Sequence, residues 1–266
     1  MSEHVLYEVD GNVAVITMNR PESLNAMSAE MLDTLHVRAG EAATNPDIRC
    51  VVITGAGRGF CAGGDVKGMA APAAGGSGGG GPVSRVDVLR KQEEVSRLLF
   101  EMPKPTIAMV NGVAAGAGMS VALAADIRVA SDQARFATAF ARVGFSGDFG
   151  GTWLLQRLVG PAKARELYFL ADILGADEAL RLGIVSRVVP HDSLMAETMA
   201  LARRLAAGPT LAYGRMKENF AFGATSTFSD ALVKEAENMI ASAVTEDHRN
   251  AARAFVEKRE PTFQGR

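Results

Sequence analysis

The stretch Thr106–Gly118, TIAMVNGVAAGAG, changes character halfway along its length. It begins with β-branched and apolar residues after Pro105, which predicts a short buried strand over 106–110. From Asn111 the residues are small and rich in glycine, and an alanine-rich pattern over 116–125 predicts a helix. A strand that passes through a tight turn into a helix is typical of an α/β protein with parallel strands.

Other strands and helices alternate around this stretch. An Asp10-Gly11-Asn12 turn within 5–18 predicts a hairpin of two short strands. The remaining β-rich runs predict strands over 49–54, 126–130 and 184–189. Helical periodicity covers 28–42, 84–101, 161–171 and 177–182. Ser84, with Asp87 three residues later, is typical of a helix start.

The C-terminal part of the chain has a different pattern. From about Ser193 onward no strand is predicted, and the longest helical pattern covers 229–258. We therefore divide the chain into a core over 1–192 and a helical region over 193–266. Such a helical tail either caps its own core or packs on another subunit, and oligomerisation is our hypothesis. The segment 70–82, AAPAAGGSGGGGP, predicts a flexible loop, either an inert one or one that gates a binding site.

Composition and charge exclude several classes of protein. The 266 residues are 48% hydrophobic and 22% charged, as in a globular protein with a sizeable core. A net charge of −2 offers no whole-chain attraction for nucleic acid or an anionic membrane. The chain has only two cysteines, no signal-peptide pattern over 1–20 and no apolar run of 18 residues. We expect a cytoplasmic protein that binds neither nucleic acid nor membrane.

Several familiar catalytic motifs fail on inspection. The glycine-rich stretch 55–65 follows a predicted strand, but Phe60 breaks the G-x-G-x-x-G pattern of dinucleotide sites. The sequence GFSGD over 144–148 is not G-x-S-x-G, because it ends in Asp148. Cys61 has no basic partner in a catalytic pattern and is interpreted as a small packing residue. The histidines show no metal-ligand spacing, so no metal site is expected; they are His4, His36, His191 and His248.

The two glycine-rich stretches, 55–65 and 111–120, have a chemistry in common. Small residues allow a ligand to approach the backbone, and a helix N-terminus has free N–H groups. Two backbone N–H groups that face each other would form an oxyanion hole for an enolate. The alternative is that these small residues serve only tight packing of a helix on a sheet.

Taken together, these motifs resemble the crotonase, or enoyl-CoA hydratase/isomerase, superfamily. The resemblance rests on GFCAGGDV over 59–66, NGVAAGAG over 111–118, and GGT and LVG at 150–152 and 158–160. Further motifs at 19–27 and 255–263 extend it over essentially the whole chain in order. The resemblance implies a spiral of ββα units, a helical C-terminal trimerisation region and acyl-CoA thioester substrates. A homotrimer or a dimer of trimers is expected, with no separate cofactor because coenzyme A is part of the substrate.

The resemblance also assigns roles to backbone groups and to the coenzyme A arm. The N–H groups of Gly64 and Ala117 would form the oxyanion hole, Ala117 standing where the family usually has glycine. The residues that would line the coenzyme A arm are Leu24, Ala26, Ala62 and Asp65. The basic residues that would approach its phosphates or adenine are Arg58, Lys67 and, across a subunit boundary, Lys258.

This chain departs from the hydratases of the family at both of their catalytic glutamates. Ser120 and Phe140 stand at those positions, and neither side chain is a strong base at neutral pH. Hydration by a pair of glutamates is therefore not expected. With Phe145, these two residues are assigned to the substrate pocket instead.

Asp148, within GFSGDFGG over 144–151, is the remaining candidate acid. Its position resembles that of the catalytic aspartate of dienoyl-CoA isomerases, 4-chlorobenzoyl-CoA dehalogenases and the epoxyphenylacetyl-CoA isomerases of phenylacetate catabolism. The sequence motifs of this chain are most similar to those of the last branch, the epoxyphenylacetyl-CoA isomerases. A dehalogenase would need a tryptophan near Phe140, and this chain has none there. We expect an acyl-CoA isomerase with Asp148 as acid and base.

Several alternatives remain open at this point. The chain could be a hydratase in which Asp148 activates water, a non-catalytic acyl-CoA-binding protein or a thioester hydrolase. Asp148 could instead cap a helix expected near Gly150. Burial among phenylalanines would raise the pKa of Asp148 and the helix N-terminus would lower it, and the sequence does not decide between them.

Overall fold

A computed structural model describes residues 3–65 and 82–266 of the chain. Its larger sheet has six strands in the order β1-β2-β3-β5-β7-β10. These strands are β1 (Val5–Asp10), β2 (Val13–Met18), β3 (Cys50–Gly55), β5 (Thr106–Val110), β7 (Ile127–Ser131) and β10 (Arg187–Val189). The β1–β2 hairpin is antiparallel and the other neighbouring pairs are parallel. The α/β class and the hairpin are thus confirmed.

A second sheet of four short strands accompanies the first, in the order β4-β6-β8-β9. These strands are β4 (Gly59–Cys61), β6 (Val113–Ala115), β8 (Arg135–Ala137) and β9 (Leu174–Gly175). Successive units give one strand to each sheet and then a helix: β3 and β4 precede α3 (Pro82–Glu101), β5 and β6 precede α4 (Ala117–Ala124), and β7 and β8 precede α5 (Gly151–Val159). This repetition is the expected spiral of ββα units. The short strands were not predicted, because two or three residues show no periodicity.

The remaining predicted elements agree with the structure apart from their ends. Helices α1 (Ala29–Thr44), α6 (Pro161–Leu170) and α7 (Ala176–Arg181) are observed, with 3-10 turns η1 (Pro21–Ser23), η2 (Phe140–Val143) and η3 (His191–Ser193). The predicted start of α3 at Ser84 is wrong, since the helix already begins at Pro82, a residue favoured in the first turn. The strand predicted over 184–189 is shorter, because the N–H groups of Ile184 and Val185 donate to Ala179 at the end of α7.

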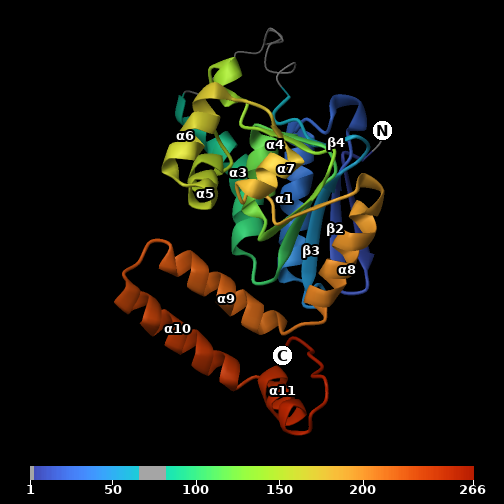
Figure 1. Ribbon diagram of the computed structural model, residues 1–266, viewed down its shortest axis with the longest axis vertical. Coiled ribbons are helices and arrows are strands. Elements are labelled where there is room, and N and C mark those ends of the chain that lie inside the picture. The colour runs from blue at the N-terminus through green and yellow to red at the C-terminus, as the bar shows by residue number, and fades with distance from the viewer. Residues whose placement is uncertain (1–2, 66–81) are drawn as a thin grey trace.

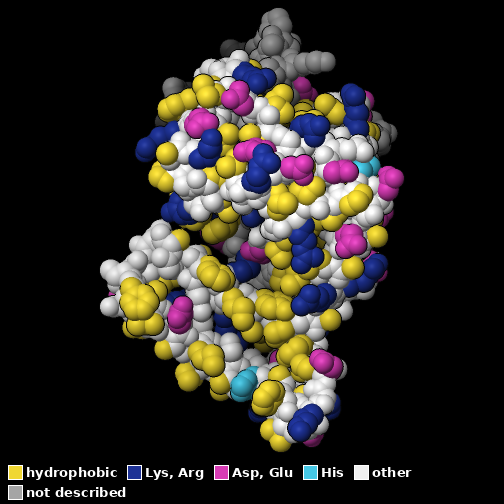
Figure 2. Space-filling model, viewed as in Figure 1, with side chains coloured by type: hydrophobic (Ala, Val, Ile, Leu, Met, Phe, Trp, Pro, Cys, Tyr) yellow, Lys and Arg dark blue, Asp and Glu magenta, His cyan; other side chains and the backbone are white. Residues whose placement is uncertain are grey.

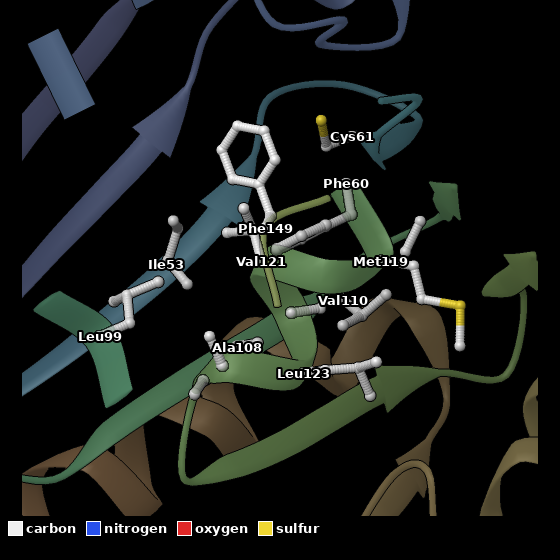
Figure 3. Packing of buried hydrophobic residues seen from close by; sticks show 14 of the residues in the cluster. Ile53, Phe60, Cys61, Leu99, Ala108, Val110, Met119, Val121, Leu123 and Phe149 are labelled. Atoms are coloured by element: carbon white, nitrogen blue, oxygen red, sulfur yellow. The ribbon is translucent and has the colours of Figure 1, made fainter. Parts of the chain in front are cut away.

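Helix α4 lies at the centre of the main hydrophobic core. All of its residues are buried, which explains why they are small or apolar on every side. Figure 3 shows Val121 and Leu123 of α4 among apolar side chains from neighbouring elements, including Leu99 and Phe149. Because α4 is enclosed, its N-terminus is presented to the interior beside β4 rather than to open solvent.

The C-terminal region consists of helices, as predicted. Helix α8 (Leu194–Ala206) packs on the larger sheet through a second apolar cluster. The helices α9 (Thr210–Gly223), α10 (Phe228–Ala243) and α11 (Glu246–Val256) extend away from the two sheets (Figure 1). The single helix expected over 229–258 is divided, because Thr245 accepts a hydrogen bond from the His248 N–H and starts α11.

Buried polar contacts tie this helical region to the core. Arg49, at the start of β3, donates to the Thr210 hydroxyl at 2.8 Å and to the Phe263 carbonyl at 2.9 Å. None of the helices in the described ranges is both long enough and apolar enough to cross a bilayer. Residues 70–81 of the glycine-rich segment 70–82, which we interpret as either an inert or a gating loop, lie outside the described residues.

Candidate active site

Two buried amides shape the loop between β3 and β4. The Asn25 side chain is fully buried and donates to the carbonyls of Ala56 and Gly59 at 2.9 and 2.7 Å. Asn111, just after β5, donates to the carbonyls of Gly55 and Gly57 at 2.9 and 2.8 Å. Buried carbonyls without partners are costly, so these amides stabilise the turn that leads into β4.

The segment after β4 pairs with residues that follow η1. The Met27 N–H donates to the Gly63 carbonyl at 2.8 Å, and the Met27 carbonyl accepts from Asp65 at 3.3 Å. Met27 therefore bridges Gly64 in parallel fashion. In a parallel bridge the bonded groups are those of the residues before and after the partner, so the N–H of Gly64 itself points away from Met27.

Ala117, the first residue of α4, presents a second backbone N–H nearby. The first N–H groups of a helix have no acceptor within the helix. A Cβ added at Gly63 would lie 3.6 Å from the Ala117 nitrogen, and one added at Gly118 would lie only 2.3 Å from the Cys61 carbonyl. Glycines thus allow α4 and β4 to approach closely enough for the N–H groups of Gly64 and Ala117 to border one site.

A cavity of about 320 Å³ lies at this junction. Its walls come from α1 and the residues just before it, the segment that follows β4, α3, the start of α4 and the turn before α5. The lining residues are Met27, Ser28, Ala29, Leu32, Gly64, Asp65, Leu89, Gln92, Ala117, Asp148 and Phe149. The structure thereby brings together Gly64, Ala117 and Asp148, which lie far apart in the sequence.

Asp148 lies in a strained turn before α5. Gly147, Phe149 and Gly150 have positive φ angles of 112°, 51° and 75°, which only glycine adopts without strain. The N-cap of α5 is Gly150 and no side chain caps the helix, so Asp148 does not act as its cap. Within the described residues, Asp148 Oδ1 is buried without a hydrogen-bond partner. A buried carboxylate oxygen of this kind is available to a ligand.

Burial raises the pKa of Asp148 to about 6, and the nearby negative charge of Glu93 contributes in the same direction. The pKa is raised on balance, so burial outweighs any lowering by the N-terminus of α5. A carboxyl group that titrates near neutral pH is suited to accept and return a proton.

Ser120 and Phe140 are buried and are not among the described residues that line the cavity. Ser120 is 2% exposed and Phe140 6% exposed, and both contact Tyr168 of α6. The Tyr168 ring stacks on Phe140 with centroids 5.9 Å apart, and the Ser120 hydroxyl donates to the Gly116 carbonyl at 3.3 Å. Phe145 is 57% exposed and is not among the described residues that line the cavity. The contact with Tyr168 was not predicted, since nothing in its helical pattern distinguishes that residue.

The residues assigned to the coenzyme A arm lie in the segment before α1 and in the segment after β4. Leu24 accepts a hydrogen bond from Ala62 at 2.9 Å, and Ala26 accepts one from Arg20, which also pairs with Asp65 at 3.3 Å. This group borders the cavity through Asp65. Arg58 is exposed in the turn between β3 and β4.

The other basic residues of the same assignment are Lys67 and Lys258. Lys67 is outside the described residues. Lys258 follows α11, which lies at the opposite end of the molecule from α4 and β4 (Figure 1). Within one chain, Lys258 is therefore remote from the cavity.

Thiol and metal chemistry receive no support from the described residues. Burial raises the pKa of both Cys50 and Cys61 to about 12, so both thiols are protonated at neutral pH. No group of three or more His, Cys, Asp or Glu side chains in the described ranges could hold a metal ion.

Backbone N–H groups beside a cavity that is lined by the carboxyl group of Asp148, with Asp65 paired to Arg20, are typical of enzymes that stabilise an oxyanion and move a proton. A sequence profile described as enoyl-CoA hydratase/isomerase matches residues 8–266. The chain belongs to this family and has the crotonase fold.

Known relatives carry both of the activities in the family's name. A probable enoyl-CoA hydratase of Rhodobacter capsulatus is 38% identical over 272 residues, covering 100% of both chains. The 1,2-epoxyphenylacetyl-CoA isomerase of Escherichia coli is also 38% identical, over 266 residues and 100% of both chains. A crystal structure of a putative enoyl-CoA hydratase from Streptomyces coelicolor superposes with a TM-score of 0.91 at 36% identity, covering 99% of this chain and 94% of that one.

Proposed function

We propose that this protein is an acyl-CoA isomerase that uses Asp148 as its acid and base. The observation that carries the proposal is the single cavity that joins Gly64, Ala117 and Asp148. A thioester carbonyl in this cavity would accept hydrogen bonds from the two backbone N–H groups. The acyl chain would then extend past the unpartnered oxygen of Asp148.

The reaction requires one proton to leave one carbon and return to another. The Asp148 carboxylate removes a proton from a carbon of the acyl group, and the electron pair moves onto the thioester oxygen as a dienolate. The N–H groups of Gly64 and Ala117 stabilise that negative oxygen. Asp148 then delivers a proton to a second carbon. Because a carboxyl proton exchanges with solvent, the product has the mass of the substrate in ordinary water and gains deuterium in deuterated water.

Hydration is the second candidate, and it is favoured by relatives named as hydratases. In this chain the positions of the family's two glutamates are Ser120 and Phe140, which Tyr168 covers. A hydratase built on these residues would have Asp148 alone to activate water. A non-catalytic acyl-CoA-binding protein and a thioester hydrolase are the remaining alternatives.

The comparison with named relatives supports two candidate acyl groups for the substrate. The relative from Escherichia coli acts on a CoA thioester with a phenylacetyl-derived ring, as its name states. We propose either a double-bond shift in an enoyl-CoA or reorganisation of such a ring, as in phenylacetate catabolism. The residues Leu24, Ala26, Ala62 and Asp65 would contact the coenzyme A arm.

A homotrimer, or a dimer of trimers, is the proposed assembly. The C-terminal helices α9 to α11 carry exposed apolar side chains, with Phe220 and Phe228 80% exposed and Phe255 85% exposed. Figure 2 shows such side chains gathered over these helices. Contiguous apolar surface of this kind favours a contact between subunits. In such an assembly Lys258 would reach the coenzyme A of a neighbouring subunit.

The test is mass spectrometry of 2-enoyl-CoA and 3-enoyl-CoA incubated separately with the enzyme in deuterated water. We expect products that gain deuterium without the mass of a water molecule, and loss of this exchange in Asp148→Asn. The exposed Asp172→Asn is the matched control and should behave as wild type. Full turnover by Asp148→Asn would refute the proposal. A product heavier by one water molecule would favour the hydratase. Release of free coenzyme A would favour a thioester hydrolase, and tight binding without deuterium exchange would favour a non-catalytic binding protein.

A further inference from the structure

Glu93 is a second carboxylate beside Asp148, and no motif in the sequence marks it. It lies on α3, where Leu89, one turn earlier on the same face, and Gln92, the preceding residue, line the cavity. Glu93 Oε1 accepts a hydrogen bond from the Phe149 N–H at 2.9 Å. Phe149 follows Asp148 directly, so the contact is made one residue from the proposed acid.

The hydrogen bond to Glu93 fixes an unfavourable backbone conformation. Phe149 has a φ of 51°, which a bulky residue rarely adopts, yet its side chain is 3% exposed. Strained backbone at a functional site persists only where surrounding contacts hold it. A carboxylate that accepts from a backbone N–H makes a stronger contact than a neutral acceptor.

The negative charge of Glu93 also acts on the carboxyl group of Asp148. Arg97, one turn further along α3, is engaged by Glu94 and Glu101 at 2.5 and 2.7 Å. Among the ion pairs of the described residues, none involves Glu93. Of the other titratable groups near Asp148, Asp65 lines the cavity and pairs with Arg20. Tyr168 of α6 is neutral at physiological pH, because burial raises its pKa to about 12.

We infer that Glu93 is a positioning residue, which holds the turn over 147–150 so that the Asp148 carboxyl faces the cavity and keeps that carboxyl proton-accepting near neutral pH. The inference rests on the proposed function in so far as Asp148 is the acid and base. The negative charge of Glu93 opposes ionisation of Asp148, in line with the raised pKa of Asp148. Glu93 itself has no part in proton transfer to the substrate.

Glu93→Gln and Glu93→Ala separate the effect of the Glu93 charge from the effect of its hydrogen bond to Phe149. The glutamine retains an oxygen that accepts from the Phe149 N–H but removes the charge. We expect the acid limb of its kcat–pH profile to move to lower pH by about 1 pH unit, with KM changed less than about twofold. The alanine also removes the hydrogen bond, and we expect kcat to fall about tenfold or more with a smaller change in KM. Glu94→Gln, on the neighbouring position of α3, is the matched control and should leave the profile unchanged.

A readout that does not require turnover separates this inference from the proposed function. The pKa of Asp148 is followed by NMR of the carboxyl carbon in protein labelled at aspartate, with the resonance assigned by its absence in Asp148→Asn. A lower pKa of Asp148 in Glu93→Gln supports the inference even if no isomerisation is found. Isomerisation by the wild type, with an unchanged pKa of Asp148 in Glu93→Gln and wild-type kcat in Glu93→Ala, would overturn it.

Discussion

At the scale of single residues, the properties of Asp148 are set by its surroundings rather than by its type. An aspartate ordinarily has a pKa near 3.8, and burial with the charge of Glu93 raises the pKa of Asp148 to about 6. The folded state therefore opposes ionisation of a group that the unfolded chain ionises readily. Placing this carboxyl in the cavity thus costs stability at the pH where it would act as a base.

Asp148→Asn should consequently stabilise the protein in a pH-dependent manner. Below pH 3.8 the carboxyl is protonated in both states and imposes no penalty; the penalty grows as the pH rises to about 6 and is constant above it. We expect the variant to match the wild type near pH 4 and to exceed it above pH 6. The expected gain is about 1–2 kcal/mol, after a discount for solvent screening of this partly exposed group.

Chemical denaturation of both proteins at pH 4 and at pH 8 measures this difference. Asp172→Asn provides the control for loss of an exposed aspartate. An equal effect of Asp148→Asn at both pH values would show that its carboxyl is not held in an unfavourable environment.

At the scale of secondary-structure elements, the site depends on how closely α4 approaches β4. The contact passes through Gly118, whose added Cβ would lie 2.3 Å from the Cys61 carbonyl and 2.7 Å from the Cys61 Cβ. The obstructing carbonyl belongs to the backbone of a buried strand and cannot move aside as a flexible side chain would. The proposed donors Gly64 and Ala117 lie on the two sides of this contact.

Gly118→Ala should therefore displace α4 from β4. We expect a loss of about 1–3 kcal/mol in the free energy of unfolding from overpacking. A larger proportional loss in kcat is also expected, because the two N–H donors would separate. Gly40→Ala is the matched control: the added Cβ meets nothing within 4 Å on α1, and removal of a helical glycine should stabilise by about 0.5–1 kcal/mol.

Thermal unfolding and steady-state kinetics of both glycine variants measure these effects. Wild-type kcat in a stably folded Gly118→Ala would mean that the close approach of α4 to β4 is unnecessary for the reaction.

At the scale of the whole molecule, α9 to α11 expose apolar side chains that a single chain leaves in water. The exposed residues include Met239 and Ile240 of α10, each 68% exposed, in addition to the phenylalanines described above. Burial of such side chains between subunits would recover about 1.5–3 kcal/mol for each large one. The proposed trimer would also bring Lys258 to a neighbouring active site.

Phe228→Glu should weaken this assembly, because a charge would have to be buried in an apolar interface. We expect the wild type to sediment as three or six chains and the variant as smaller species with weaker binding of coenzyme A. Val37→Glu, an exposed apolar position on α1 that is 52% exposed, is the control and should keep the wild-type assembly. A wild type that remains monomeric at micromolar concentration would contradict the proposal.

The sequence by itself determined the α/β class and the order of the main strands and helices, because strand and helix periodicity and glycine-rich turns are local properties of the chain. The candidate residues Gly64, Ala117 and Asp148 came from the resemblance of its motifs to the crotonase superfamily. Reasoning from periodicity missed strands as short as β9, and it joined α10 to α11 across a cap residue, Thr245, that interrupts the helical pattern only through its hydrogen bond.

Only the tertiary structure decided what surrounds those candidates. In the folded chain Met27 pairs with Gly64, and Tyr168 stacks on Phe140. Glu93 accepts a hydrogen bond from the N–H of Phe149, which lies 56 residues further along the chain. The tertiary structure also buries Asp148 and places the charge of Glu93 nearby, and both raise the pKa of Asp148. Contacts and desolvation of this kind depend on segments brought together by packing, and no local pattern in the sequence encodes them.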